Sequence, residues 1–139
     1  MSTNISLKQQ VSEEIPWLFR ELGLQITDND FNPKSFGDSF VILESPALRV
    51  RFVRDRGQVS VEVASLADPR TWWHLEHVCE VISGQTAESG FELSAAADLL
   101  RRNFKALTDY LGSKYNDTKQ ELERRAEIRK RAFLKRFSG

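Results

Sequence analysis

Cysteine is nearly absent from this chain of 139 residues, and the single Cys79 cannot form an internal disulfide. No apolar run approaches the roughly 20 residues that cross a membrane. Residues 1–4 show no basic segment leading into an apolar one, as a signal peptide would. We therefore expect a cytoplasmic protein without membrane spans.

The sequence also lacks the common signatures of catalysis. It contains no Gly-x-Ser-x-Gly and no glycine-rich phosphate loop. His74, His77 and Cys79 are residue types found in zinc sites, but helical spacing turns Cys79 away from the two histidines. The chain has no further Cys or His to complete the ligands. We predict no catalytic residue, no cofactor and no metal site, and hence a protein that is not an enzyme.

Net charge is absent as well, since 20 basic residues balance 20 acidic ones. A dedicated nucleic-acid binder usually carries a basic excess. The balance nevertheless hides an asymmetry. Residues 1–113 hold 11 Lys and Arg against 16 Asp and Glu, a net charge of −5, and residues 114–139 hold 9 against 4, a net charge of +5. The sequence predicts an acidic body with a basic C-terminal segment, and nucleic acid is not its expected main partner.

Hydrophobic residues make up 40% of the chain, which is typical of a single globular domain. Apolar residues from Leu7 to Leu22 recur at helical spacing, and Pro16 should kink this helix or divide it into two. Residues 27–39 are rich in Asp, Asn, Ser, Gly and Pro, which predicts a loop. Three strands follow, at about 40–43, 48–54 and 59–63.

Burial fixes the pairing of the second and third of these strands. Pairing Val53 with Ser60 sets Phe52 opposite Val61 and Val50 opposite Val63, so that one face is entirely apolar. The same register sets Arg51 opposite Glu62 on the polar face, and a slip of one residue would mix the two faces. The connecting loop should therefore contain two or four residues, with Gly57 free to take a positive φ.

Three helices complete the expected fold. Asp68-Pro69 has the pattern of a helix start, and that helix should end at Gly84. A second helix should end at Gly112, and a third, basic helix should span about 117–137. We predict a single α+β domain over residues 1–139, in which an N-terminal helix and a three-stranded antiparallel sheet precede three helices packed on the sheet.

Two features are candidates for binding a partner. Arg49, Arg51, Arg54 and Arg56 lie on or near the polar face of the predicted hairpin, where they could serve a partner or simply face water. Trp72 and Trp73 point about 100° apart on a helix, which allows one of them to lie nearer the surface. Packing of both at the edge of the core is the alternative.

The basic C-terminal helix is open to two interpretations. Its cations from Arg124 to Arg136 could contact nucleic acid or an acidic protein. Phe133, Leu134 and Phe137 lie among them, however, and would equally fit a helix that closes against the domain with its cations near the C-terminal dipole end. The same pattern is compatible with a dimer, so the oligomeric state stays undetermined.

Three stretches carry a resemblance to small bacterial proteins similar to immunity proteins of polymorphic and contact-dependent toxin systems. They are residues 36–45, the segment from Leu48 to Gln58 with its Arg54-Asp55-Arg56-Gly57 turn, and Trp72-Trp73-His74-Leu75-Glu76. The resemblance implies no catalytic residues. It implies a cytoplasmic protein that binds and blocks a cognate toxin, and the expected partner is therefore a protein.

Overall fold

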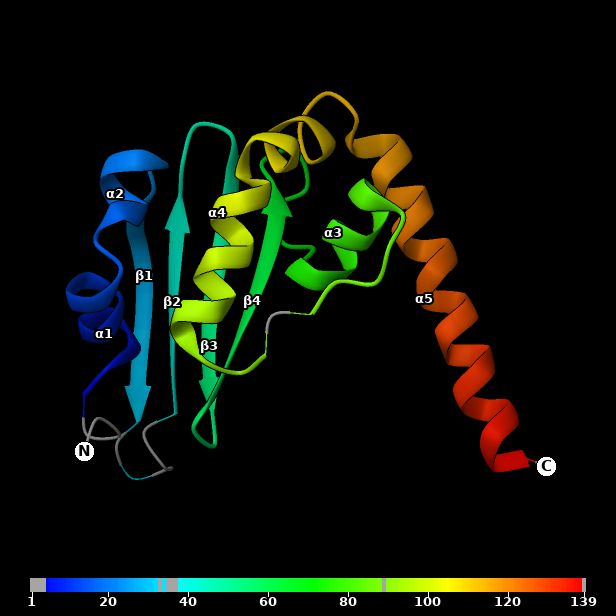
Figure 1. Ribbon diagram of the computed structural model, residues 1–139, viewed down its shortest axis with the longest axis horizontal. Coiled ribbons are helices and arrows are strands. Elements are labelled where there is room, and N and C mark those ends of the chain that lie inside the picture. Colours follow the sequence, from blue (N-terminus) through cyan, green and yellow to red (C-terminus); the bar gives the residue numbers. More distant parts are fainter. Residues whose placement is uncertain (1–4, 33, 35–37, 89, 139) are drawn as a thin grey trace.

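The computed structural model describes residues 5–32, 34, 38–88 and 90–138. Two short helices, α1 (Leu7–Glu14) and α2 (Trp17–Glu21), precede the strands β1 (Gln25–Asn32), β2 (Asp38–Glu44), β3 (Leu48–Asp55), β4 (Gln58–Ser65) and β5 (Trp73–His74). The helices α3 (Leu75–Ser83), α4 (Leu93–Tyr110) and α5 (Tyr115–Ser138) follow. The strands form one antiparallel sheet in the order β1-β2-β3-β4-β5 (Figure 1).

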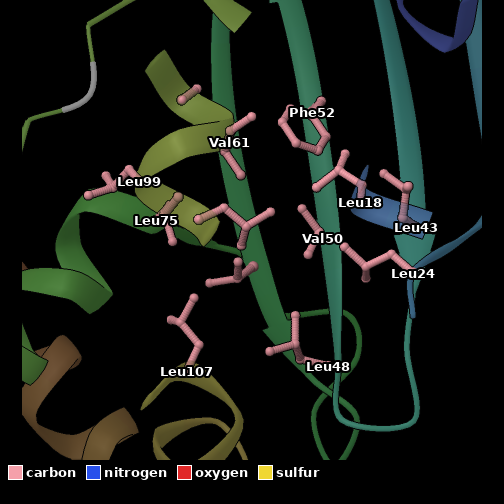
Figure 2. Close-up of a cluster of buried hydrophobic side chains, with 14 of the residues drawn as sticks. Leu18, Leu24, Leu43, Leu48, Val50, Phe52, Val61, Leu75, Leu99 and Leu107 are labelled. Atoms are coloured by element: carbon pink, nitrogen blue, oxygen red, sulfur yellow. The ribbon is translucent and has the colours of Figure 1, made fainter. Parts of the chain in front are cut away.

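The sheet buries only one of its faces. Along β3, Leu48, Val50 and Phe52 are fully buried, whereas Arg49 and Arg51 between them are half-buried. Alternation of this kind is expected for an antiparallel sheet covered on one side. The buried side chains of α1, α2, α3 and α4 join the same core as those of β3 and β4, so these helices cover the inner face (Figures 1 and 2).

The predicted register of the β3–β4 hairpin is confirmed. Val53 lies opposite Ser60, and the pairs of Phe52 with Val61 and of Arg51 with Glu62 follow from it. The loop has two residues, Arg56 and Gly57, with φ angles of 53° and 81°. Two positive φ angles define the type I′ turn, whose twist matches that of the strands it joins.

Of the two outcomes expected at Pro16, a kink or a division of the helix, the structure shows the division. Ser6 caps α1, since its hydroxyl accepts a hydrogen bond from the Gln9 N–H at 3.1 Å. The helix ends at Glu14, before Ile15 and Pro16, and α2 starts directly after the proline. A proline inside a helix removes a backbone donor and clashes with the preceding turn, which explains the break.

The predicted architecture of one N-terminal helix, three strands and three helices is wrong, because the sheet has five strands and two helices precede it. One missed strand is β1, which lies in the segment expected to be a loop, although residues 33 and 35–37 of that segment lie outside the described residues. The side chains of β1 are mostly polar and exposed, because it is an edge strand. A bulge between Ile26 and Asp28 further disturbs its alternation.

The helix expected from Asp68 begins later, at Leu75, because the preceding residues form a turn and the short strand β5. The Asp68 carboxylate accepts a hydrogen bond from the Thr71 hydroxyl at 2.9 Å and thus closes a turn. Trp73 and His74 then pair with Val63 and Glu62 as the short strand β5. The predicted end of this helix at Gly84 is confirmed, with a φ of 73° in the left-handed region.

The prediction that the last helix packs on the sheet is wrong for α5. Its first half packs against α3 and α4, where Leu122 is fully buried, and its second half projects away from the body (Figure 1). Among the described residues, no helix is both long and apolar enough to cross a membrane.

The type I′ turn leads to a prediction about stability. Replacing Arg56 with Asn should raise the free energy of unfolding by about 0.5 kcal/mol, because Asn tolerates a positive φ better. Replacing Gly57 with Ala should lower it by about 1–2 kcal/mol. Urea unfolding at an unchanged m-value would measure both, and an equal effect of the two substitutions would contradict the turn type.

Candidate protein-binding surface

The face of the sheet opposite the core has no covering helix in the described structure (Figure 1). We call it the outer face. Its side chains alternate with those of the core along the strands, and most are half-buried or exposed, although Ile42 near its centre is only 9% exposed and Ala64 is fully buried. The outer face includes Asp28, Asp30, Asp38, Phe40, Ile42, Glu44, Arg49, Arg51, Val53, Asp55, Gln58, Ser60, Glu62 and Ala64.

Trp72 meets two of the predicted arginines at one side of this face. The guanidinium carbon of Arg51 lies 4.5 Å from the centre of a Trp72 ring, and that of Arg49 lies 4.9 Å from it. Both distances are within the range of cation–π attraction. We call these three residues the Trp72 patch. Tryptophan and arginine are the residue types most enriched among energetically dominant interface residues.

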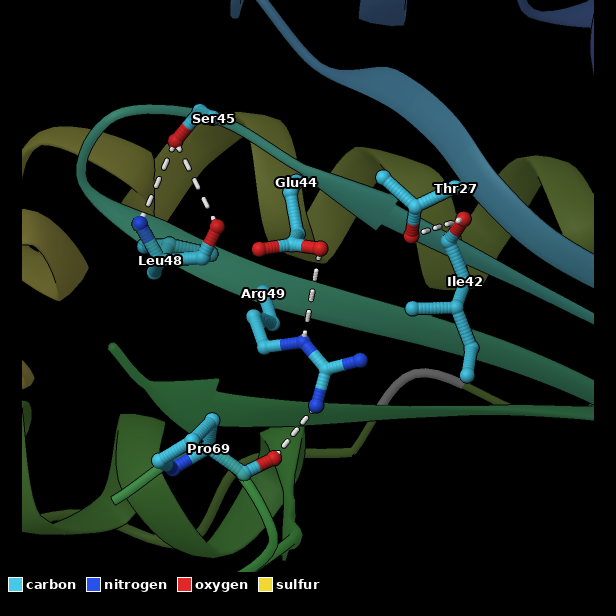
Figure 3. Close-up of polar contacts among 7 residues, drawn as sticks. All are labelled: Thr27, Ile42, Glu44, Ser45, Leu48, Arg49 and Pro69. Carbon is cyan, nitrogen blue, oxygen red and sulfur yellow. Dashed lines mark hydrogen bonds and ion pairs between the residues drawn. The ribbon is translucent and has the colours of Figure 1, made fainter. Parts of the chain in front are cut away.

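Ion pairs hold the two arginines of the Trp72 patch in place. Arg51 contacts Glu62 at 2.7 Å, and Arg49 contacts Glu44 at 3.8 Å. Arg49 also donates a hydrogen bond to the carbonyl of Pro69, which ties β3 to the segment that carries Trp72 (Figure 3). The patch is therefore partly neutralised and ordered before any partner arrives, which lowers the entropy cost of binding.

Arg54 and Arg56 are not part of this patch. Arg54 is 5% exposed and donates hydrogen bonds to the side-chain oxygen of Gln10, at 2.9 Å, and to the carbonyl of Ile5. Burial lowers the pKa of Arg54, and the Asp38 carboxylate opposes this shift. Arg54 thus ties the N-terminal segment to β3, whereas Arg56 is exposed in the hairpin turn.

Trp73 points to the other side of the chain from Trp72, where its contacts stabilise the fold. Its indole N–H donates to the Tyr115 hydroxyl at 3.2 Å, and that hydroxyl donates to Asp68 at 2.7 Å. Burial and the hydrogen bond to Asp68 raise the pKa of Tyr115 to about 12. The same hydrogen bond from Tyr115, with that from Thr71, lowers the pKa of Asp68. This network anchors the start of α5 to β5, so the two adjacent tryptophans have different roles.

A second feature of the outer face was missed by the sequence reasoning. Asp30, Asp38 and Asp55 surround Phe40 and Val53 in an open depression of about 400 Å³ at one end of the sheet, whose lining is completed by Asn32, Ser39 and the largely buried Arg54. We call it the acidic depression. It joins β1, β2 and β3, and Asp30 belongs to β1, in the segment that the sequence predicts to be a loop. The pairing of β2 with β3 sets Phe40 opposite Val53, and the pairing of β1 with β2 adds Asp30 opposite Phe40.

His74 and His77 contact each other, whereas Cys79 is buried in the core. The rings of His74 and His77 are 5.1 Å apart, and burial, with help from Arg129 and His74, lowers the pKa of His77. Cys79 is buried, which raises the pKa of its thiol to about 11 and keeps the thiol neutral at pH 7. No group of three His, Cys, Asp or Glu residues that could hold a metal ion occurs in the described part of the chain.

The projecting half of α5 is the other exposed feature. Residues 128–137, which we call the basic arm, carry five cations and no acidic residue. Four large apolar side chains of the arm are 51–74% exposed, namely Ile128, Phe133, Leu134 and Phe137. The arm projects away from the body and is not closed against the domain, which was one of the two interpretations of the sequence (Figure 1).

Comparison with known proteins gives no family for this chain. No protein-family model, no curated protein and no solved structure matches it. The resemblance to immunity proteins stays a prediction, and the function has to be argued from the surfaces themselves.

The different surroundings of the four arginines can be tested by mutation. Arg54→Ala should lower the free energy of unfolding by about 2–3 kcal/mol, because it removes the donor to Gln10 and to the Ile5 carbonyl. Arg56→Ala should change it by less than about 0.5 kcal/mol. Thermal or urea unfolding of both variants would show this contrast, and equal stabilities would contradict the role given to Arg54.

The state of Cys79 makes a second prediction. At neutral pH the folded protein should react with iodoacetamide far more slowly than the protein in urea, because its thiol is buried and protonated. Mass spectrometry of the alkylated protein over time would measure both rates. Rapid alkylation of the folded protein would contradict the burial and protonation of this thiol.

Proposed function

We propose that this protein is a non-enzymatic, cytoplasmic protein-binding module, and that its partner docks on the outer face of the sheet. The observation that carries the proposal is the Trp72 patch, in which a half-buried tryptophan lies against two arginines on a face that no helix of the described structure covers.

The composition of the outer face supports a protein partner rather than a small ligand. The face has apolar side chains at its centre, Phe40, Ile42 and Val53, with charged residues around them. An apolar centre with a polar rim is the usual anatomy of a protein interface. An ordered aromatic anchor at one side adds the residue type that most often dominates the binding energy.

The edges of the sheet are less suited to this role. β1 forms one edge, and its bulge and its acidic residues Asp28 and Asp30 oppose pairing with another strand. At the opposite edge, β5 covers β4 at Glu62 and Val63, and the Val59 N–H donates to the carbonyl of Phe91 at 2.9 Å. A partner therefore has more to gain from the open face than from either edge.

The charge of the acidic depression suggests the chemistry of the partner. Asp30, Asp38 and Asp55 would attract basic side chains, and Phe40 and Val53 would contact apolar ones. The resemblance to immunity proteins implies such a partner, since many toxin domains that attack nucleic acid are basic. We therefore propose a basic protein, of the kind that a toxin domain provides, as the occupant of the outer face.

Nucleic acid is the alternative partner, through the cations of the basic arm. Its five cations are all exposed, which favours contact with phosphates. Contact with phosphates alone would not explain the four exposed apolar side chains between them. We therefore place the protein-binding function first.

The proposal is tested by capture from the host with matched variants. The tagged protein should retain one stoichiometric protein partner, and Trp72→Ala and Val53→Lys should each weaken that binding about tenfold or more. Trp17→Ala is the matched control, because Trp17 is also a half-buried tryptophan against an arginine, Arg101 at 4.6 Å, but lies on α2.

Binding that all three variants retain equally would contradict the outer face as the docking site. Circular dichroism and unfolding curves must show that each variant is folded, so that a loss of binding reports on the surface. Capture of nucleic acid in place of a protein would favour the alternative.

A further inference from the structure

The basic arm continues a helix face that is buried elsewhere. In the first half of α5, Tyr115, Thr118 and Leu122 are 5%, 3% and 1% exposed, against the rest of the domain. The same helical spacing leads on to Phe133 and Phe137, whose rings are in contact with centroids 4.9 Å apart. The stripe therefore runs past Ala126 and Arg129 beyond the surface that covers it, and its outer part, Phe133 and Phe137, is an apolar face left exposed in the described structure.

The charge of the arm disfavours direct packing against the arm of a second copy. Two arms packed side by side, parallel or antiparallel, would bring five cations against five. Like charges at such distances oppose association. The surface that covers the arm should instead be acidic and should offer an apolar floor for Phe133 and Phe137.

A second copy of this chain carries such a surface. The acidic depression presents three carboxylates around Phe40 and Val53, and they outnumber the one cation of its described lining, Arg54, which is largely buried. Arginine forks match carboxylates in charge and geometry, so Arg129 or Arg136 could pair there beside an inserted phenylalanine.

The arm cannot reach the depression of its own chain. α5 is a helix of 24 residues that leaves the body on the side of α3, whereas the depression lies across the sheet at β1, β2 and β3 (Figure 1). A helix does not fold back on itself without a break, and no break occurs between Tyr115 and Ser138. The contact must therefore form between molecules.

We propose that the basic arm of one molecule docks into the acidic depression of a second copy. This inference rests on the proposed function, since it uses the outer face as a protein-binding surface and names one occupant for part of it. The contact is head-to-tail, so it can close into a pair by exchange of two arms or continue into longer chains.

Sedimentation of the full chain tests this proposal. At about 0.01 M salt, where charges act over about 30 Å, the average mass should rise with concentration above the 16.0 kDa of one chain. At about 1 M salt, where the screening length is about 3 Å, it should return toward one chain. A mass of one chain at every concentration and salt would overturn the proposal.

Two double variants test whether the arm and the acidic depression form the contact. Phe133→Ser with Phe137→Ser removes the apolar part of the arm, and Asp30→Lys with Asp55→Lys reverses the depression. Each should weaken self-association about tenfold or more. Glu13→Lys with Asp109→Lys is the control for the second variant, because it makes the same change in net charge at exposed positions elsewhere.

Mixing the two variants gives the most specific test of the proposal. The arm variant keeps its depression and the depression variant keeps its arm, so the mixture should form a heterodimer although each variant alone does not associate. Absence of the heterodimer would contradict docking between these two surfaces. Equal association by the charge control and the depression variant would contradict it as well.

The same set of experiments also tests two other targets for the arm, an anionic membrane and nucleic acid. Vesicles with anionic lipids or a DNA duplex, added at low salt, would be bound by the arm if its target were a membrane or nucleic acid. Binding of either by a protein that stays monomeric would overturn the second-copy proposal. It would leave the proposed function standing, because capture of a partner through Trp72 and Val53 is measured independently.

Discussion

One-sided burial of the antiparallel sheet is the constraint on which the rest of the structure depends. Leu48, Val50 and Phe52 of β3 point to the core, together with Val59, Val61 and Val63 of β4. The hairpin register keeps these residues on a single face, and the helices that follow and precede the sheet supply the cover. Because the alternate residues must then face away from the core, the same pattern that builds the domain also leaves a second face for other uses.

That second face is organised by a small number of strong contacts. Glu44 and Glu62 hold Arg49 and Arg51 against Trp72, while the acidic depression lies at the other end of the same strands. Arg54 and Trp73 are close to these residues in sequence but point into the structure, where they tie the N-terminal segment and α5 to the sheet. The side on which a residue lies thus decides its role more than its position in the chain does.

The sequence allowed prediction wherever burial produces a clear period. The β3–β4 register followed from Phe52, Val61 and their neighbours, and the break of the first helix followed from Pro16. β1 could not be predicted in this way, since an exposed edge strand needs backbone pairing with β2 and no apolar alternation. β5 was missed because Asp68-Pro69 resembles a helix start, whereas Tyr115 and Lys119, far along the chain, engage the Asp68 carboxylate. The Trp72 patch was predicted in part, because its three residues were all candidates. The acidic depression could not be predicted without β1.

Binding of a partner protein should cover the outer face. Hydroxyl-radical footprinting of the complex would detect this cover. This method reads the solvent exposure of individual side chains by mass spectrometry. The account predicts that oxidation of Trp72 and Phe40 falls several-fold when the partner is bound, while oxidation of Trp17, which lies against Arg101 away from this face, is unchanged. Unchanged oxidation of Trp72 and Phe40 in a stoichiometric complex would contradict the account.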